Sequence, residues 1–183
     1  GKPKMRVALM TGCAQQVLRP SINEASIRLL ARHGCEVVIA NGAGCCGALA
    51  HHMGCENDAT ISAQANITAW DNSREEDGEL DAIVINTSGC GTMVKDYGFM
   101  FRNDPKWAER ADWVSQKAKD ITEVLMLLEL KAKKTAQDTT IAYHSACSIQ
   151  HGQNINEEPK TLLEKVGFKV SVPAEAHLCC GSA

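Results

Sequence analysis

A cysteine spacing that occurs twice is the feature that most constrains this chain. The pattern is one cysteine, a stretch of 31 residues, and then a Cys-Cys-Gly triplet. The first copy consists of Cys13 and residues 45–47, and the second consists of Cys147 and residues 179–181. Each member of the second copy lies 134 positions after its counterpart. Chance rarely places three cysteines and a glycine at one offset, so the pattern indicates a duplicated unit that keeps its thiols in register.

The segments around these cysteines alternate between strand-like and helix-like patterns. Apolar runs predict strands over residues 4–11, 35–40, 81–88, 140–147 and 168–172. Helical periodicity predicts helices over 21–33, around 59–70, over 107–128 as one helix or two, and over 159–167, with a polar loop over 71–79. Such alternation indicates an α/β fold with a mostly parallel sheet flanked by helices. We expect a duplicated Rossmann-like unit, with a first copy over 1–134 and a truncated second copy over 135–183.

Two of the predicted helices have a definite apolar face. In the helix over 21–33 the predicted face consists of Ile22, Ala25, Leu29 and Leu30, and Gly34 follows the helix. In the helix around 59–70 it consists of Ala59, Ala63, Ile67 and Trp70. These faces are the ones we expect to pack on the sheet.

Four thiols are predicted to meet at one edge of the sheet. Cys13 ends the first strand, Cys45 and Cys46 follow the second, and Cys90 follows the third. Ligands of parallel sheets collect at the carboxyl ends of the strands. Thiolates are soft donors that suit iron–sulfur clusters, zinc or cuprous ions, so the set indicates a four-thiol metal site. Gly47 would let the backbone turn closely against a bulky cofactor.

The second copy offers the same kind of site with fewer thiols. Its candidate ligands are Cys147, Cys179 and Cys180, and Gly181 corresponds to Gly47. His144 is the first histidine to test as an additional ligand, although strand alternation should point it away from Cys147. We therefore expect the first copy to bind metal more tightly than the second.

Two cysteines, Cys35 and Cys55, have no partner in the repeat. We expect them to be ordinary buried cysteines, which are common in protein cores.

Composition narrows the function classes further. The formal net charge is -3 and no long basic block occurs, which argues against nucleic acid as a partner. The first residues contain no signal-peptide pattern, and no apolar run is long enough to span a bilayer. The nine cysteines are an odd number, which fits metal binding in a reducing compartment better than a disulfide framework. We expect a cytoplasmic protein.

Longer stretches around the cysteines resemble a known family. The two Cys-x31-Cys-Cys-Gly patterns resemble the cysteine-rich CCG domains shared with heterodisulfide reductases. More specific are INEASIRLLARHGCEVV, GAGCCGALAHHMG, SGCGTMVKDYGFM and YHSACSIQHGQ. These resemble the glycolate oxidase iron–sulfur subunits over nearly the whole chain.

The resemblance implies an electron-transfer role. In that family the iron–sulfur protein accepts electrons from flavoprotein (FAD-binding) subunits that oxidise glycolate to glyoxylate, so no catalytic centre is expected in this chain. Partner subunits could hold it at the inner face of the membrane. The fuller CCG pattern has a cysteine where this chain has Thr87, so a four-thiol 4Fe-4S cluster or another four-ligand centre is favoured over the five-thiol centre of the heterodisulfide reductase relative. The family's ferredoxin-like cysteine run is not in this sequence.

Other functions remain open at this point. Four cysteines also suit a structural zinc module, and vicinal cysteines could serve a thiol–disulfide enzyme. An iron–sulfur subunit of a lactate-oxidising or heterodisulfide-reductase-like complex would show a similar pattern. Residues 42–47 also match the dinucleotide fingerprint G-x-G-x-x-G, but no acidic residue ends the next strand at the expected distance.

Overall fold

A computed structural model describes residues 2–132 and 139–179 of the chain. The chain divides into two compact units, Gly1–Ile121 and Thr122–Ala183, which are described separately below. The division predicted between residues 134 and 135 falls outside the described residues and stays a prediction.

Unit 1 is built on a four-stranded sheet in the order β2-β1-β3-β4, in which every strand pair is parallel. The strands are β1 (Met5–Leu9), β2 (Cys35–Val38), β3 (Ala82–Ile85) and β4 (Ala118–Asp120). The two central strands are apolar almost throughout and are buried, as expected for a parallel sheet covered on both faces. The predicted α/β architecture with a parallel sheet flanked by helices is confirmed.

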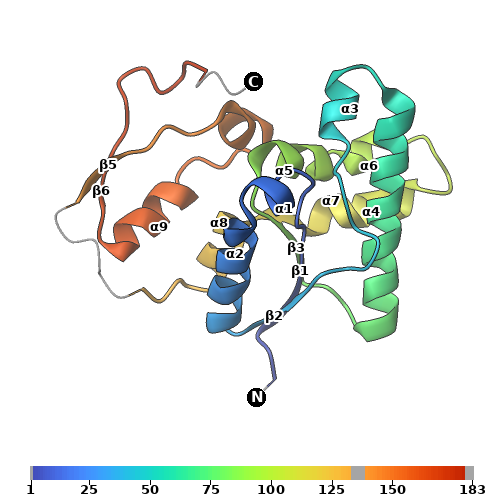
Figure 1. Cartoon of the computed structure of the whole chain (residues 1–183), viewed down its shortest axis with the longest axis horizontal. Coiled ribbons are helices and arrows are strands. Elements are labelled where there is room, and N and C mark those ends of the chain that lie inside the picture. The colour runs from blue at the N-terminus through green and yellow to red at the C-terminus, as the bar shows by residue number, and fades with distance from the viewer. Residues whose placement is uncertain (1, 133–138, 180–183) are drawn as a thin grey trace. The chain divides into compact units, whose positions relative to one another are not determined.

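Helices connect these strands. They are α1 (Gln15–Leu18), α2 (Pro20–Arg32), α3 (Ala48–His52), α4 (Glu56–Asp77), α5 (Ser88–Lys95), α6 (Tyr97–Met100) and α7 (Ala108–Lys117). Figure 1 shows α2 on one face of the sheet and α4 on the other. The helices thus cover both faces of the sheet.

The main core lies between the sheet and α4. Successive residues of a strand face opposite sides, so Ala8 of β1 and Met10 just after it belong to this core together with Ile83 and Ile85 of β3. The helix contributes the buried face that its sequence predicts, which consists of Ala59, Ala63, Ile67 and Trp70.

Unit 2 contains a parallel two-stranded sheet of β5 (Thr140–Ala142) and β6 (Lys169–Ser171). Its helical segments are α8 (Ile121–Leu127, which begins at the unit boundary), the π-helical turn η1 (Ser148–Gly152) and α9 (Glu158–Val166). The order β5-α9-β6 corresponds to the order β1-α2-β2 in unit 1.

The polar segment predicted as a loop over 71–79 is helical as far as Asp77, so this prediction was wrong for most of the segment. Asp71 explains why, because its buried carboxylate pairs with Arg74 one turn later and with Arg110 of α7, each at 2.5 Å. These ion pairs stabilise the helical conformation of this polar stretch.

The region 107–128 is neither one helix nor two helices directly joined. It forms α7, the short strand β4 and α8. Ala118 pairs with Ile83 on β3, so sheet pairing interrupts a sequence with helical periodicity.

The predicted face of α2 was only partly right. Leu30 is fully buried, but Ile22 is 44% exposed, and the polar residues Asn23 and Ser26 are buried in its place. Both polar side chains bind Asn86 at the end of β3, which explains their burial.

The tightest backbone position in unit 1 is Gly47, which precedes α3. Its φ is +84°, and a Cβ atom there would lie 2.9 Å from the carbonyl oxygen of Ala59. We expect Gly47→Ala to lower the free energy of unfolding by about 1–2 kcal/mol for the left-handed backbone and by about 1–3 kcal/mol more for the clash with α4. Chemical denaturation of the metal-free chain measures both contributions.

Gly54 provides the matched control, because its φ is +75° and nothing lies within 4 Å of a Cβ atom there. Gly54→Ala should show the backbone cost alone. Equal losses for the two variants would contradict the close approach of Gly47 to α4.

Candidate metal centre

The four predicted thiols of unit 1 gather at the carboxyl edge of the sheet. Cys13 lies in the loop between β1 and α1, and Cys45 and Cys46 lie in the loop between β2 and α3. Cys90 is the third residue of α5, inside the helix that follows β3. Because β1 pairs in parallel with both β2 and β3, the three connections leave the sheet at the same edge.

Two of these sulfurs are in direct contact. The Sγ atoms of Cys46 and Cys90 lie 3.2 Å apart and share a hydrogen bond. Cys46 is 3% exposed, whereas Cys13 is exposed at the outer side of the set. The thiols therefore range from the buried Cys46 through the half-buried Cys90 to the exposed Cys13.

The contact between Cys46 and Cys90 lets the pair hold one proton. The hydrogen bond with Cys90 lowers the pKa of Cys46 to about 6, against the effect of burial. The same bond, followed by burial, raises the pKa of Cys90. Cys46 is then a thiolate and Cys90 a thiol at neutral pH.

Backbone N–H groups surround the vicinal pair and favour negative charge on its sulfurs. The amide of Gly47 donates to Sγ of Cys45 at 3.4 Å, and the amide of Ala48 donates to Sγ of Cys46 at 3.5 Å. Burial raises the pKa of Cys45, the Gly47 amide lowers it, and the Cys13 thiol raises it further. Hydrogen bonds of this kind stabilise anionic sulfur.

A fully buried pair of polar residues holds the Cys45–Cys46 loop from behind. Asn66 of α4 accepts a bond from the Gly44 amide at 2.8 Å and donates to the Cys45 carbonyl at 2.7 Å. Tyr97 of α6 donates from its hydroxyl to the Cys46 carbonyl at 2.8 Å. Asn66 also donates to the Tyr97 hydroxyl at 3.2 Å, so the two residues form one unit. Burial raises the pKa of Tyr97, which keeps the hydroxyl protonated.

A second polar network joins α1, which follows Cys13, to the start of α5, which carries Cys90. Gln15 donates to Asn23 and Asn86, and the Thr87 hydroxyl donates to the Gln15 side chain at 2.7 Å. Thr87 and Gln15 also line a hollow of about 260 Å³ beside the thiols of Cys13 and Cys90. The hydroxyl of Thr87 therefore braces the edge of the site at the position where the fuller pattern has a cysteine.

Sequence reasoning missed both polar networks. The signal that was available is the interruption of the predicted apolar face of α2 by Asn23 and Ser26. No comparable signal marks Asn66 or Tyr97, because their partners are backbone atoms of a distant loop.

The two cysteines outside the repeat differ from each other. Cys35 is buried as predicted, at the start of β2. Cys55 is exposed just before α4, so the prediction that it is a buried core cysteine was wrong. The turn that begins α4 faces solvent, which leaves its side chain without a core to enter.

Unit 2 arranges its described cysteines in a similar local setting. Cys147 precedes the π-helical turn, and Cys179 is exposed after β6. The His144 ring bonds through Nε2 to the Leu178 carbonyl at 2.9 Å, and Gln150 reaches the carbonyls of Ser145 and Ala176. Cys180 and Gly181 lie outside the described residues. His144 thus acts as a tether of the Cys179 loop in this structure.

The donor set of unit 1 fits a soft metal centre by its chemistry, since it offers four sulfurs, one of them already anionic. Over residues 2–132 and 139–179, no group of three or more cysteine, histidine, aspartate or glutamate side chains is placed so that it could hold a metal ion, so the thiols would have to shift to ligate one. Cys46 and Cys90 would have to move apart for both sulfurs to ligate metal, because at 3.2 Å they are hydrogen-bonded to each other.

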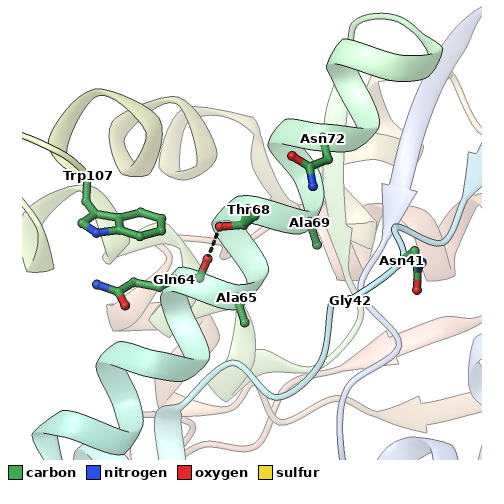
Figure 2. Close-up of a pocket in the computed structure, with 8 residues that line it drawn as sticks. All are labelled: Asn41, Gly42, Gln64, Ala65, Thr68, Ala69, Asn72 and Trp107. Atoms are coloured by element: carbon green, nitrogen blue, oxygen red, sulfur yellow. Dashed lines mark hydrogen bonds between the residues drawn. The ribbon is translucent and has the colours of Figure 1, made fainter.

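A larger hollow, of about 470 Å³, lies elsewhere in unit 1 (Figure 2). Figure 2 shows Gln64, Thr68 and Asn72 following one side of α4, with Trp107 at one end and the Asn41–Gly42 loop across from them. Its lining contains no thiol, imidazole or carboxylate. It therefore offers no metal donors and none of the chemistry of the cysteine edge.

Comparison with known proteins adds the family. The family model for the cysteine-rich domain (CCG) matches residues 7–95 and 141–183. The chain is 41% identical over 98% of its length to the glycolate oxidase iron-sulfur subunit of Escherichia coli (strain K12), and 34% identical over its full length to the probable glycolate oxidase iron-sulfur subunit of Bacillus subtilis (strain 168). The aligned region spans 44% of the length of the first protein and 41% of the length of the second.

A third relative is shorter. The chain is 32% identical to lactate utilization protein A of an Exiguobacterium species, over 96% of the chain and 70% of that protein.

Among the described residues, no helix has the length and apolar character needed to cross a membrane.

The shared proton of Cys46 and Cys90 gives a direct test of the geometry. In the reduced, metal-free chain the thiolate absorbance in the ultraviolet should rise by one thiolate as the pH increases through about 6. The absorbance rises with pH because Cys46, whose pKa is lowered, loses its proton on the alkaline side of that value. Cys90→Ala removes the donor and leaves the burial, so this step should move to higher pH.

Cys35→Ala is the control, because burial raises the pKa of Cys35 and it contributes no thiolate in this range. An unchanged step in Cys90→Ala would show that the thiol pair is not the cause.

Proposed function

The chain belongs to the cysteine-rich CCG family, and from this premise we propose that it is an iron–sulfur subunit that carries electrons in a complex oxidising glycolate to glyoxylate. The observation that carries the proposal is the gathering of four thiols at the ends of three parallel strands, with backbone amides donating to two of the sulfurs. The names of two relatives, which are glycolate oxidase iron-sulfur subunits, support the choice of metal and of complex.

The proposed ligands in unit 1 are Cys13, Cys45, Cys46 and Cys90, with Gly47 giving the close turn behind the vicinal pair. Four thiolates are the usual ligand set of a 4Fe-4S cluster, and Thr87 offers no fifth sulfur. When bound, such a cluster stores and releases single electrons. The residues of the chain hold the sulfurs, exclude water from Cys46 and leave the Cys13 side accessible to a redox partner.

We extend the same role to the second copy of the pattern, with Cys147, Cys179 and Cys180 as ligands and Gly181 in the place of Gly47. The local structure supports this at one further position. Gln16 and Gln150, which are 134 residues apart, both fold back onto the backbone just before their cysteine, at the carbonyls of Gly12 and Ser145. The two copies, over 1–134 and 135–183, would thus share a way of shaping the cysteine loop.

The partners in this proposal are the FAD-binding flavoprotein subunits of the same complex. The chain spans less than half the length of the glycolate oxidase relatives, so the rest of such a protein also contributes to the working assembly. Its location would be the cytoplasm, where partner subunits could hold it at the inner face of the membrane.

Lactate is the second candidate substrate of the complex. The similarity to lactate utilization protein A favours it, since the chain covers 70% of that protein at 32% identity. The electron-carrying role of this chain would be the same in both cases. A structural zinc module is the alternative from a different class, because four thiolates also satisfy tetrahedral zinc.

Metal analysis with cysteine variants tests the cofactor and its ligands together. Purified or reconstituted without oxygen, the chain should be brown and contain iron and acid-labile sulfide. Replacing any of the four thiols of unit 1 by serine should remove most of the iron held there, because each supplies one of four bonds. Cys55→Ser is the control and should keep its iron, since Cys55 lies outside the repeat and faces solvent. Zinc at full occupancy with no uptake of iron would refute the proposal.

Electron transfer from a partner is tested by turnover. The iron-loaded chain alone should not oxidise glycolate or lactate, because the proposal places substrate oxidation on the flavin of the partner. Mixed with a flavoprotein subunit of a glycolate oxidase, it should be reduced when glycolate is added, as seen by bleaching of its visible absorbance. Turnover of either acid by the isolated, flavin-free chain would contradict this division of roles.

A further inference from the structure

Two buried polar side chains outside the ligand set, Asn66 and Tyr97, are bonded to the loop that carries the vicinal cysteines. Both are fully buried, and both direct their hydrogen bonds to the backbone around Cys45 and Cys46. They also bond to each other, at 3.2 Å. Here they reach 21 and 51 residues along the chain, and together they bond the backbone of three consecutive residues.

The direction of these bonds fixes the orientation of the loop. The carbonyls of Cys45 and Cys46 accept from the Asn66 and Tyr97 side chains, on the core side. The Cys46 carbonyl and the Gly47 amide belong to one peptide plane, in which C=O and N–H point in opposite directions. Holding that carbonyl in the core therefore turns the Gly47 amide toward the sulfurs, where it donates to Cys45. The Ala48 amide, one peptide further on, donates to Cys46.

We infer that Asn66 and Tyr97 are positioning residues that set the reduction potential of the proposed cluster by holding the Gly47 and Ala48 amides on its cysteine sulfurs. The inference rests on the proposed function. Hydrogen bonds to the sulfurs are one of the ways in which a protein tunes such a potential, because reduction adds negative charge that the N–H groups stabilise. Losing them lowers the potential.

Tyr97→Phe is the principal test, because phenylalanine keeps the packing of the ring and removes only the hydroxyl. The variant loses the bond to the Cys46 carbonyl and leaves Asn66 without one of its acceptors. In the iron-loaded full chain we expect the one-electron equilibrium to shift at least threefold toward the oxidised form, which corresponds to about 28 mV at 59 mV per tenfold. Redox titration followed by electron paramagnetic resonance measures it.

A second measurement needs no cluster. In the reduced, metal-free chain, hydrogen exchange at Gly44, Gly47 and Ala48 should be at least threefold faster in Tyr97→Phe than in the wild type. Asn66→Ala should show faster exchange at Gly44 as well, since it removes the acceptor of that amide. If Asn66→Ala fails to fold, Tyr97→Phe still decides the question.

Ile67→Val is the control for loss of packing. Ile67 is the neighbour of Asn66 on α4, is fully buried, and belongs to the hydrophobic core. This variant should leave both the potential and the exchange at Gly47 and Ala48 unchanged, although it loosens the same helix. A potential that moves equally in Ile67→Val and Tyr97→Phe would reduce Tyr97 to a packing residue and overturn the inference.

The outcomes separate this inference from the proposed function. If the wild-type chain takes up no iron, the proposed function fails, and unchanged exchange in Tyr97→Phe would overturn the positioning role independently. If the wild type loads iron and Tyr97→Phe has the same potential, the inference alone fails. If Tyr97→Phe remains folded but no longer holds iron, while Ile67→Val does hold it, the positioning role is supported.

Discussion

The parallel pairing of β1 with both β2 and β3 is the constraint on which the rest of unit 1 depends. Parallel strands end at the same edge, so each loop that follows them starts within reach of the others. The pairing needs apolar strands buried on both faces, and the burial needs α2 and α4. Figure 1 shows α2 and α4 on opposite faces of this sheet.

At that edge, electrostatic interactions determine which of the thiols are ionised. Four sulfurs brought together would repel one another if all were ionised. Cys46 and Cys90 resolve this by sharing a proton, and the N–H groups of Gly47 and Ala48 stabilise charge on the vicinal pair. The buried Asn66 and Tyr97 act one layer further back, on the carbonyls of the same loop. The site thus consists of sulfurs, a surrounding set of amides, and a polar support embedded in the core.

The positions of the thiols could be predicted from the sequence because they depend on strand order and on a repeated spacing. Cys13 and the 45–47 triplet follow strands that apolar runs make visible, and the face of α4 follows from its helical period. The strand β4 could not be predicted, because its pairing with β3 overrides a helical pattern. The shared proton and the contacts of Tyr97 also could not, because both depend on distances between residues 44 and 51 positions apart.

Solvent exposure falls from Cys13 to Cys46, and this affects the order in which the cysteines are oxidised. A peroxide arriving from solvent meets Cys13 first, and oxidation of its sulfur gives a sulfenic acid. Cys45 is the neighbouring thiol, so the sulfenic acid can condense with it to a disulfide, which cellular reductants reverse. Cys46 is 3% exposed, so a peroxide in solvent reaches it less readily than Cys13. Oxidation by solvent peroxide therefore begins at Cys13, where the first products can still be reduced.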